Sequence, residues 1–299
     1  MSIQSLKHSD CITTTTEKLS QTFGRFNKNV HIFRNMFDWE LPQWNFDKKK
    51  VRKEMIPEWN SDKDIVVGWA GLTSHFEDIK RMHGIFKHIH DKYPNTKFVL
   101  AGMALKDTQI EIQYDEKGRP NFKEKEIQDE NILYRNRVKN LYSDLDSNRL
   151  KIFDALPLEE YAKFYALFDI SLAYVEHNAF ASCKSEIKVI ESLHYDCISV
   201  FSDFGGYHDF WKEVPQKLKR NNVGISVTSP KVWSNALEYW IEHYDEAKKY
   251  FSELRKYSDE TYDINKHIEE RLSFYMEEIE HFDEEQTNEI AKYTYYNAA

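Results

Sequence analysis

The middle of this chain alternates short apolar runs with longer stretches that carry apolar residues at helical spacing. The first run, Asp64 to Gly71 (DIVVGWAG), is rich in strand-forming residues and ends in small ones. The segment from His75 to Tyr93 places its apolar residues three or four positions apart, at Ile79, Met82, Ile85, Phe86 and Ile89. The first pattern is typical of a buried strand and the second of an amphipathic helix. Together they predict one strand-helix unit.

The same order of elements recurs along the chain. Further apolar runs predict strands at Lys97 to Gly102, Lys151 to Asp154, Ile170 to Tyr174 and Ile198 to Phe201. Helices are expected at Leu158 to Leu167 and at Ser185 to Tyr195. Strands that alternate with helices are typical of a parallel sheet with helices on both faces. The predicted fold class is therefore α/β.

One segment breaks this rhythm. Between Gln109 and Gln128, alternating apolar and polar residues flank the turn-rich sequence DEKGRPN, Asp115 to Asn121. This pattern predicts a β-hairpin inserted at about residues 107–130. A mobile surface loop is the alternative.

The N-terminal part departs from the repeat. Strand signals at Ile12 to Thr16 and Val30 to Phe33 enclose a helix-like stretch, which predicts a small partial α/β segment within residues 1–38. The stretch from Trp39 to Asp62 contains two prolines, three tryptophans and many charges. Such a composition is typical of a linker.

The C-terminal part is predicted to be helical and charged. After Pro230, one apolar face is formed by Trp233, Leu237, Trp240 and Ile241, and a final helix is expected at Ile264 to Ile279. The tail from His281 to Ala299 is acidic and then tyrosine-rich, so we expect it to be loosely ordered. The chain thus divides into an N-terminal remnant with a linker (1–60), a main α/β domain (61–260) and a C-terminal helix with its tail (261–299).

Composition limits the classes of partner. The formal net charge of −9 and the pI near 5.8 disfavour nucleic acids and anionic membrane surfaces, which recruit clustered Lys and Arg. The cysteines Cys11, Cys183 and Cys197 form no CxxC pair and no metal-ligand spacing, so reduced thiols and a cytoplasmic location are expected. The sequence has no apolar run long enough for a membrane span or a signal peptide.

The stretch from Tyr174 to Ser202 holds the strongest candidate for chemistry. Lys184 and Ser185 lie at the predicted start of a helix, where free N–H groups and the helix dipole favour an anion. Glu191 follows seven residues later, two helical turns on, and its carboxylate can accept hydrogen bonds from two ribose hydroxyls. Ligands of open parallel sheets bind at the carboxyl ends of the strands, where these residues lie.

Each of these residues also has a structural interpretation. Gly71 fits a phosphate-approaching loop, but a tight turn explains it as well. Lys184 and Lys188 fit a solvated helix face, and Glu191 fits a salt bridge to Lys188. Spacing alone leaves both interpretations open.

The wider sequence adds a resemblance. The pieces that carry it are VVGWAGLTSHFEDIKRM, KFVLAGM, the stretch from Arg149 to Phe210 with its K-S-x-x-K-x-x-E helix, and Gly224. In this order they resemble the nucleotide-sugar-binding half of GT-B glycosyltransferases of the group 1, family-four type, from Asp64 to about Tyr262. The resemblance implies a Rossmann-like sheet for this part of the chain.

The resemblance also implies roles. The donor diphosphate is expected at Gly71, Leu72, Lys184 and Ser185, and the ribose at Glu191. The base is expected beside Phe153, Asp154, Ala155 and Leu156. Candidate contacts to the donor sugar are His75, Glu176, His177 and Asn178. The implied reaction is a retaining sugar transfer from a nucleoside diphosphate sugar, with UDP or GDP as carrier, without a bound metal or any other cofactor.

Two features depart from the family pattern. Cys183 occupies the position of the first glutamate of the usual E-x₇-E pair, as in relatives that carry the K-S form of the motif. Residues 5–38 resemble only the last strand-helix-strand unit of the acceptor domain, and the final helix resembles the one that crosses back to that domain. The chain is therefore expected to be a truncated product, one half of a split enzyme, or a partner of a separate acceptor-domain chain or oligomer, and the acceptor is unknown.

Two other functions remain open from the sequence. A protein of this fold could bind a nucleotide sugar without turnover, as a partner protein. It could also act as a sugar-nucleotide epimerase, because a fold does not determine its chemistry. A Rossmann dehydrogenase is disfavoured, because no G-x-G-x-x-G follows any predicted strand.

Overall fold

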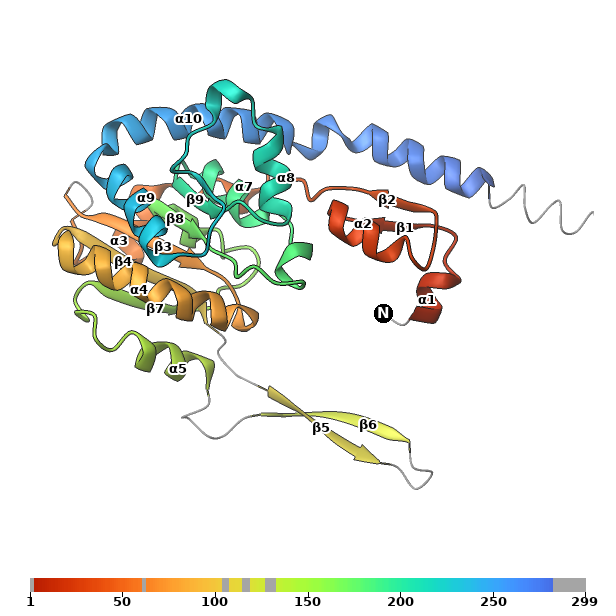
Figure 1. Ribbon diagram of the computed structural model, residues 1–299, viewed down its shortest axis with the longest axis horizontal. Helices are drawn as coiled ribbons and strands as arrows, with labels where there is room; N and C mark the ends of the chain where they lie inside the picture. The colour runs from red at the N-terminus through yellow and green to blue at the C-terminus, as the bar shows by residue number, and fades with distance from the viewer. Residues whose placement is uncertain (1–2, 61–62, 104–107, 115–118, 127–132, 282–299) are drawn as a thin grey trace, which may run out of the picture.

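The computed structural model describes residues 3–60, 63–103, 108–114, 119–126 and 133–281. At its centre is a six-stranded parallel sheet in the order β10-β9-β8-β3-β4-β7 (Figure 1). The strands are β3 (Ile65–Ala70), β4 (Thr96–Met103), β7 (Leu150–Asp154), β8 (Ile170–Ala173), β9 (Ile198–Ser202) and β10 (Gly224–Ile225). This arrangement confirms the predicted α/β class. Five of the six strands coincide with predicted runs, and β10 lies at the glycine Gly224.

Helices cover both faces of the sheet. They are α4 (Phe76–Lys92), α5 (Tyr134–Leu141), α6 (Lys163–Leu167), α7 (Ile187–His194), α8 (Gly206–Glu213), α9 (Pro230–Glu242) and α10 (Tyr244–Thr261). Helix α4 packs against α5 and α9, whereas α7 packs against α10. The strand order reverses after β7, and α7 and α10 then lie on the face opposite to α4, α5 and α9.

The core follows from the apolar pattern of the sequence. Residues Ile65 to Trp69 of β3 are all buried, as expected for a strand covered on both faces. The predicted stripe of α4 is fully buried, and so are Trp233, Leu237 and Trp240 of α9. These contacts fix the position of β3, whose carboxyl end reaches the centre of one edge of the sheet.

The first part of the chain forms a small unit beside the main sheet. It contains α1 (Ile3–Lys7), β1 (Ile12–Thr14), α2 (Glu17–Phe23) and β2 (Val30–Ile32), with β1 and β2 paired in parallel. A C-terminal helix, residues 268–281, follows the short 3-10 turn Ile264–Lys266 and packs on this unit. The rings of His31 and Phe274 stack at 4.4 Å. The predicted α/β segment and final helix are therefore present, and residues 282–299 of the predicted tail lie outside the described residues.

The stretch from Trp39 to Asp62 differs from the predicted linker. It contains the 3-10 turn Pro42–Trp44 and the helix α3 (Lys48–Met55), which packs against α6. Trp44, Val51 and Trp59 are buried in the main core. Burial of these large apolar side chains explains why the segment is ordered despite its prolines and charges.

The predicted hairpin is confirmed. Strands β5 (Thr108–Tyr114) and β6 (Pro120–Glu126) pair antiparallel and project away from the main sheet (Figure 1). Residues 104–107, 115–118 and 127–132, which include most of the predicted turn and both joins of the insertion, lie outside the described residues. The alternative of an irregular surface loop is wrong for the two strands.

Candidate functional site

The strand order creates a switch point between β3 and β8. These strands are neighbours, but the chain leaves β3 toward β4 and leaves β8 toward β9, on opposite sides. Helices that follow the two strands therefore diverge and open a crevice at their carboxyl ends. Residues that follow β3 and residues that precede α7 meet at this crevice.

Three basic side chains gather there. The Lys184 Nζ lies 3.1 Å from Nδ1 of His75 and 3.3 Å from its Nε2. The Lys188 Nζ lies 3.4 Å from the same Nε2. Two lysines on one imidazole repel each other when protonated, and burial together with Lys184 lowers the pKa of Lys188 to about 7. An anion placed between them would relieve this repulsion.

One carboxylate lies beside the three basic groups. Asp78 Oδ2 is 2.7 Å from Nδ1 of His75 and 4.0 Å from Nζ of Lys184. Its other oxygen accepts a hydrogen bond of 2.8 Å from the backbone N–H of Glu176. Asp78 therefore orients His75 and ties the β8 loop to α4, but it cannot neutralise two lysines. Burial lowers the pKa of His75, which keeps its ring neutral at pH 7.

The start of α7 differs from the prediction. The helix begins at Ile187, after Glu186 as its N-cap, and Lys184 has extended backbone angles (φ −70°, ψ 143°) after the 3-10 turn Ala181–Cys183. The expected helical spacing between Lys184 and Glu191 is therefore wrong. Lys188, for which a solvated helix face was the alternative interpretation, is partly buried and is the helical cation of the site. Its signal in the sequence was the second lysine of K-S-x-x-K-x-x-E.

Two glycines make room for Lys188. A Cβ on Gly71 would lie 2.6 Å from Nζ of Lys188 and 2.7 Å from the ring of Trp69, over which the ammonium sits at 4.6 Å. Gly102 supports Gly71 from β4, because its φ is +92° and a Cβ there would lie 2.6 Å from the Gly71 carbonyl oxygen. Gly71 is thus required by the Trp69 ring and also leaves space for the Lys188 ammonium, which goes beyond the requirements of a tight turn.

Glu191 lies next to this cluster in a closed environment. It is only 4% exposed, and it accepts a hydrogen bond from the hydroxyl of Tyr161. Burial raises its pKa to about 7, although hydrogen bonds from Tyr161 and Tyr165 oppose the shift. Among the described residues no ion pair joins Glu191 to Lys188, so the alternative interpretation of Glu191 as a salt-bridge partner of Lys188 is not supported. Tyr161 was not identified from the sequence, since nothing in its neighbourhood distinguished it from a packing residue.

The remaining predicted residues surround the crevice. Ser185 accepts a hydrogen bond of 2.8 Å from Asn35, and Leu72 is 61% exposed. Glu176 lies 3.3 Å from Arg81, the ring of His177 stacks on Phe204 at 4.2 Å, and Asn178 accepts a hydrogen bond from the backbone of Ala181. Phe153 and Asp154 end β7, followed by Ala155 and Leu156, two strands away from β3, and Asp154 pairs with Arg135. The structure therefore brings His75, Lys184 and Gly71 together and leaves the β7 residues at the side of the same edge.

No protein-family model matches the chain, and no curated protein matches it. Solved structures do match it. HepE of Anabaena in complex with UDP and glucose has a TM-score of 0.61 and 16% identity, over 91% of this chain and 67% of that one. Sucrose-phosphate synthase of Thermosynechococcus elongatus has a TM-score of 0.61 and 12% identity, over 92% and 60%. A glycosyltransferase from Rickettsia africae has a TM-score of 0.63 and 12% identity, over 93% and 66%.

This chain spans about two thirds of the length of those structures. Among its described residues, no helix combines the length and the apolar character needed to cross a membrane. At these identities the similarity concerns the fold alone. The chain therefore has the fold of the GT-B glycosyltransferases.

Proposed function

We propose that this chain is the donor-binding half of a glycosyltransferase that uses a nucleoside diphosphate sugar. The observation that carries the proposal is the cluster of His75, Lys184 and Lys188 at the switch point, with Asp78 as its nearby carboxylate. A diphosphate supplies the negative charge that this cluster lacks. HepE, whose fold is similar, has also been solved with UDP-glucose.

The diphosphate would lie between the end of β3 and the start of α7. Lys184 and Lys188 would donate to its oxygens, together with the Ser185 hydroxyl and the backbone N–H groups of Gly71 and Leu72. As the sugar bond breaks, negative charge accumulates on the leaving diphosphate, and these fixed cations stabilise it. This role of the lysines supports a transfer without a metal. Retention of the sugar configuration remains part of the proposal, on the basis of the resemblance.

The ribose would bind at Glu191. Its carboxylate already accepts the Tyr161 hydroxyl, and the ribose hydroxyls would replace this donor. The base would then lie toward β7, near Phe153 to Leu156. His75, Glu176, His177 and Asn178 border the crevice on the side where the donor sugar would extend.

A partner is proposed for the acceptor side. The unit of β1, α2 and β2 is small beside the main sheet. We propose that a separate acceptor-domain chain, or a second copy of this chain, completes the cleft.

A nucleotide-sugar-binding protein without turnover is the second candidate. It is favoured by Cys183, which replaces a carboxylate near the donor sugar, and by Glu191, which Tyr161 and Tyr165 already occupy. The two candidates differ in turnover, because both bind the donor but only an enzyme transfers or hydrolyses its sugar.

Calorimetric titration with UDP-, GDP- and ADP-sugars tests the proposal. We expect one carrier nucleotide to bind more tightly than the others. Its 2′-deoxy form should bind the unmodified protein more weakly. In the Glu191→Ala variant, the two forms should bind equally. Release of free sugar from the bound donor then separates the enzyme from the binding protein. Absence of binding by all three classes would contradict both candidates, and interconversion of free nucleotide sugars would favour an epimerase.

Donor binding is expected to take up a proton above pH 7. Because the pKa of Lys188 is about 7, its amine is largely neutral at pH 8 in the free protein, and a bound diphosphate raises that pKa again. Affinity for UDP should therefore fall as the pH rises above 7. Titration at pH 8 in buffers of different ionisation enthalpy measures the uptake, which should approach one proton.

The Lys188→Gln variant is the control for this measurement. It should show almost no uptake at pH 8, and the unmodified protein should show little uptake at pH 6, where Lys188 is already protonated. Equal uptake by the variant and the unmodified protein would exclude Lys188 as the source.

A further inference from the structure

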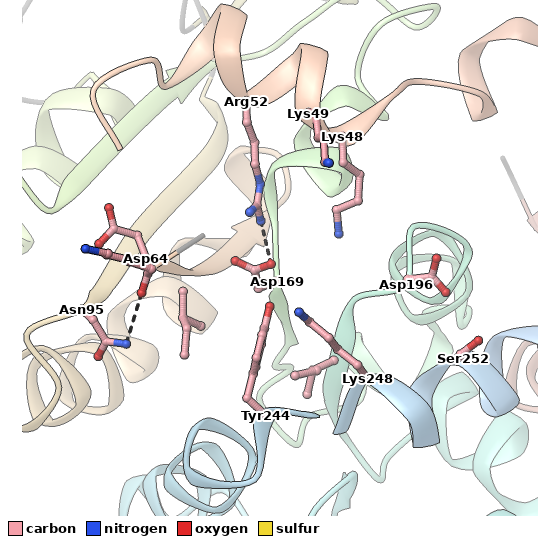
Figure 2. Close-up of a pocket in the computed structure, with 13 residues that line it drawn as sticks. Lys48, Lys49, Arg52, Asp64, Asn95, Asp169, Asp196, Tyr244, Lys248 and Ser252 are labelled. Atoms are coloured by element: carbon pink, nitrogen blue, oxygen red, sulfur yellow. Dashed lines mark hydrogen bonds and ion pairs between the residues drawn. The ribbon is translucent and has the colours of Figure 1, made fainter. Parts of the chain in front are cut away.

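A second pocket lies at the opposite edge of the sheet. It has a volume of about 770 Å³ and borders the amino ends of the central strands, at Ile65 of β3, Asp169 before β8 and Ile198 of β9. Helix α3 forms one wall and α10 forms another (Figure 2). Pockets of this size accommodate small organic ligands. The basic cluster of the candidate donor site lies at the other ends of the same strands.

The carboxylates that line this pocket already have cationic partners. Asp169 pairs with Arg52 at 2.8 Å, and its other oxygen accepts the backbone N–H of Val66. Asp196 pairs with Arg255 at 2.6 Å. Asp64 lies 3.8 Å from Lys97. Each negative charge of the lining is therefore offset, and two of the three partners, Lys97 and Arg255, belong to residues outside the lining.

The lysines of the lining are not offset in this way. Lys48, Lys49, Lys63 and Lys248 all line the pocket. Within the part of the chain that the structure describes, none of these four has a carboxylate within salt-bridge distance. The pocket thus carries an excess of positive charge in a protein whose formal net charge is −9. A protein with negative net charge does not attract anions over its whole surface, so these lysines form a local positive site.

Lys48 is held in place for binding. Its ammonium group donates to the carbonyl oxygens of Phe168 at 2.8 Å and Tyr195 at 2.9 Å. An ammonium group has three donors, so one remains after these two bonds. Because both partners are neutral carbonyls, the positive charge of Lys48 is retained. Fixing the cation before binding lowers the entropic cost of ordering it around a ligand.

The cations also lie on different walls. Figure 2 shows Lys48, Lys49 and Arg52 on one side, with Lys248 and Tyr244 on the other and Asp169 between them. The Lys248 Nζ sits 4.3 Å from the centre of the Tyr244 ring. A ligand that engages both walls must present negative charge in more than one direction. A single carboxylate does not do so, whereas linked phosphate groups do.

We propose that this pocket binds a small ligand with two or more phosphate groups. The proposal concerns a free ligand, because the cations surround a concave site between two helices, whereas a membrane surface would face one side of α3. The site is separate from the donor site: the six residues of β3 lie between them, a distance of about 20 Å at roughly 3.3 Å per residue. Both sites can be occupied at once, so the ligand acts as an effector and does not compete with the donor.

Inorganic pyrophosphate is the probe for the test. It is titrated into a variant of the full chain that carries Lys184→Gln and Lys188→Gln, because these two substitutions disable the donor site. Two further pairs are compared in that background: Lys49→Gln with Lys248→Gln in the pocket, and Lys50→Gln with Lys53→Gln as the matched control. Lys50 and Lys53 are also exposed and lie on α3, but they do not line the pocket. Circular dichroism verifies that every variant is folded.

We expect pyrophosphate to bind the donor-site variant, with a loss of at least about tenfold for the pocket pair and less than about twofold for the control pair. Loss of all binding in the donor-site variant would overturn the proposal, because pyrophosphate would then bind only at the switch point. Equal losses for the two pairs would also overturn it and assign the anion to the outer surface of α3.

Discussion

Replacement of both Lys184 and Lys188 with Gln is expected to weaken binding of a nucleoside diphosphate by a factor of about 100 or more. Hydrogen bonds to charged groups contribute about 1.5–3 kcal/mol each, and two of them are lost here. Binding of the bare nucleoside should change little, because neither lysine reaches the base or the ribose in the proposed arrangement. Calorimetric titration of UDP and uridine, or of whichever nucleotide pair binds, measures both effects.

The experiment is best performed with protein that also carries Lys49→Gln and Lys248→Gln. These substitutions remove two of the four lysines that line the second pocket and so reduce its contribution to the measured binding. Lys80→Gln is a suitable control, because Lys80 is exposed on α4 and pairs only with Glu77 at 3.8 Å among the described residues. Equal losses for nucleotide and nucleoside in the double variant would contradict the phosphate role of the two lysines.

Substitution of Gly102 with Ala is expected to lower the free energy of unfolding by about 2–4 kcal/mol, through backbone strain and overpacking. The φ of +92° disfavours any side chain, and the new Cβ would approach the Gly71 carbonyl oxygen to 2.6 Å. Since that neighbour is backbone, it can give way only if the turn after β3 moves. Chemical denaturation measures the stability. Diphosphate affinity should also fall in this variant, because a shift of Gly71 would displace the neighbouring Lys188 ammonium.

Gly84→Ala provides the matched comparison. Gly84 lies in α4, and a Cβ there would have no neighbour within 4 Å. Alanine has the higher helix propensity, so this variant should be more stable by about 0.5–1 kcal/mol. If both glycine variants shifted the stability in the same direction, strain at Gly102 would not be the cause of its effect.

The strands of the main sheet were predictable because burial on both faces requires continuous apolar runs. Five strands follow from such runs, α4 from its apolar residues at helical spacing, and the hairpin β5-β6 from alternating residues around a turn. Helices α5 and α8 were not predicted, because α5 buries only Tyr134 and Val138, and α8 begins at Gly206 after a glycine N-cap without a side-chain hydrogen bond. The helix expected from Leu158 begins only at Lys163, because turns occupy the residues after Pro157.

The candidate site was only partly predictable. Lys184 and Gly71 were found from the sequence, but the start of α7 depends on Glu186 as N-cap, and a glutamate is a weak sequence signal for that position. Lys188 therefore appeared to share a solvated face with Lys184. The pocket of α3 and α10 was not predictable either, since it combines residues almost 200 positions apart, from Lys49 to Lys248. The run of lysines near residue 48 had the composition of a linker, but burial of Val51 and the contacts of Lys48 and Arg52 hold this helix against the sheet edge.

The chain passes between its small unit and the main sheet twice, and the two passages lie side by side. Phe37 forms an isolated parallel bridge with Asp263, through hydrogen bonds from Phe37 to Tyr262 and from Ile264 to Phe37. On one side of this bridge, the helix 268–281 packs on the residue that follows β2, with the rings of Phe33 and Phe274 5.2 Å apart. The unit of β1, α2 and β2 therefore forms one body with the helix 268–281. A rotation of this body at Phe37 would break the contacts of α2 with α8 and with the 3-10 turn Ala181–Cys183, directly before Lys184.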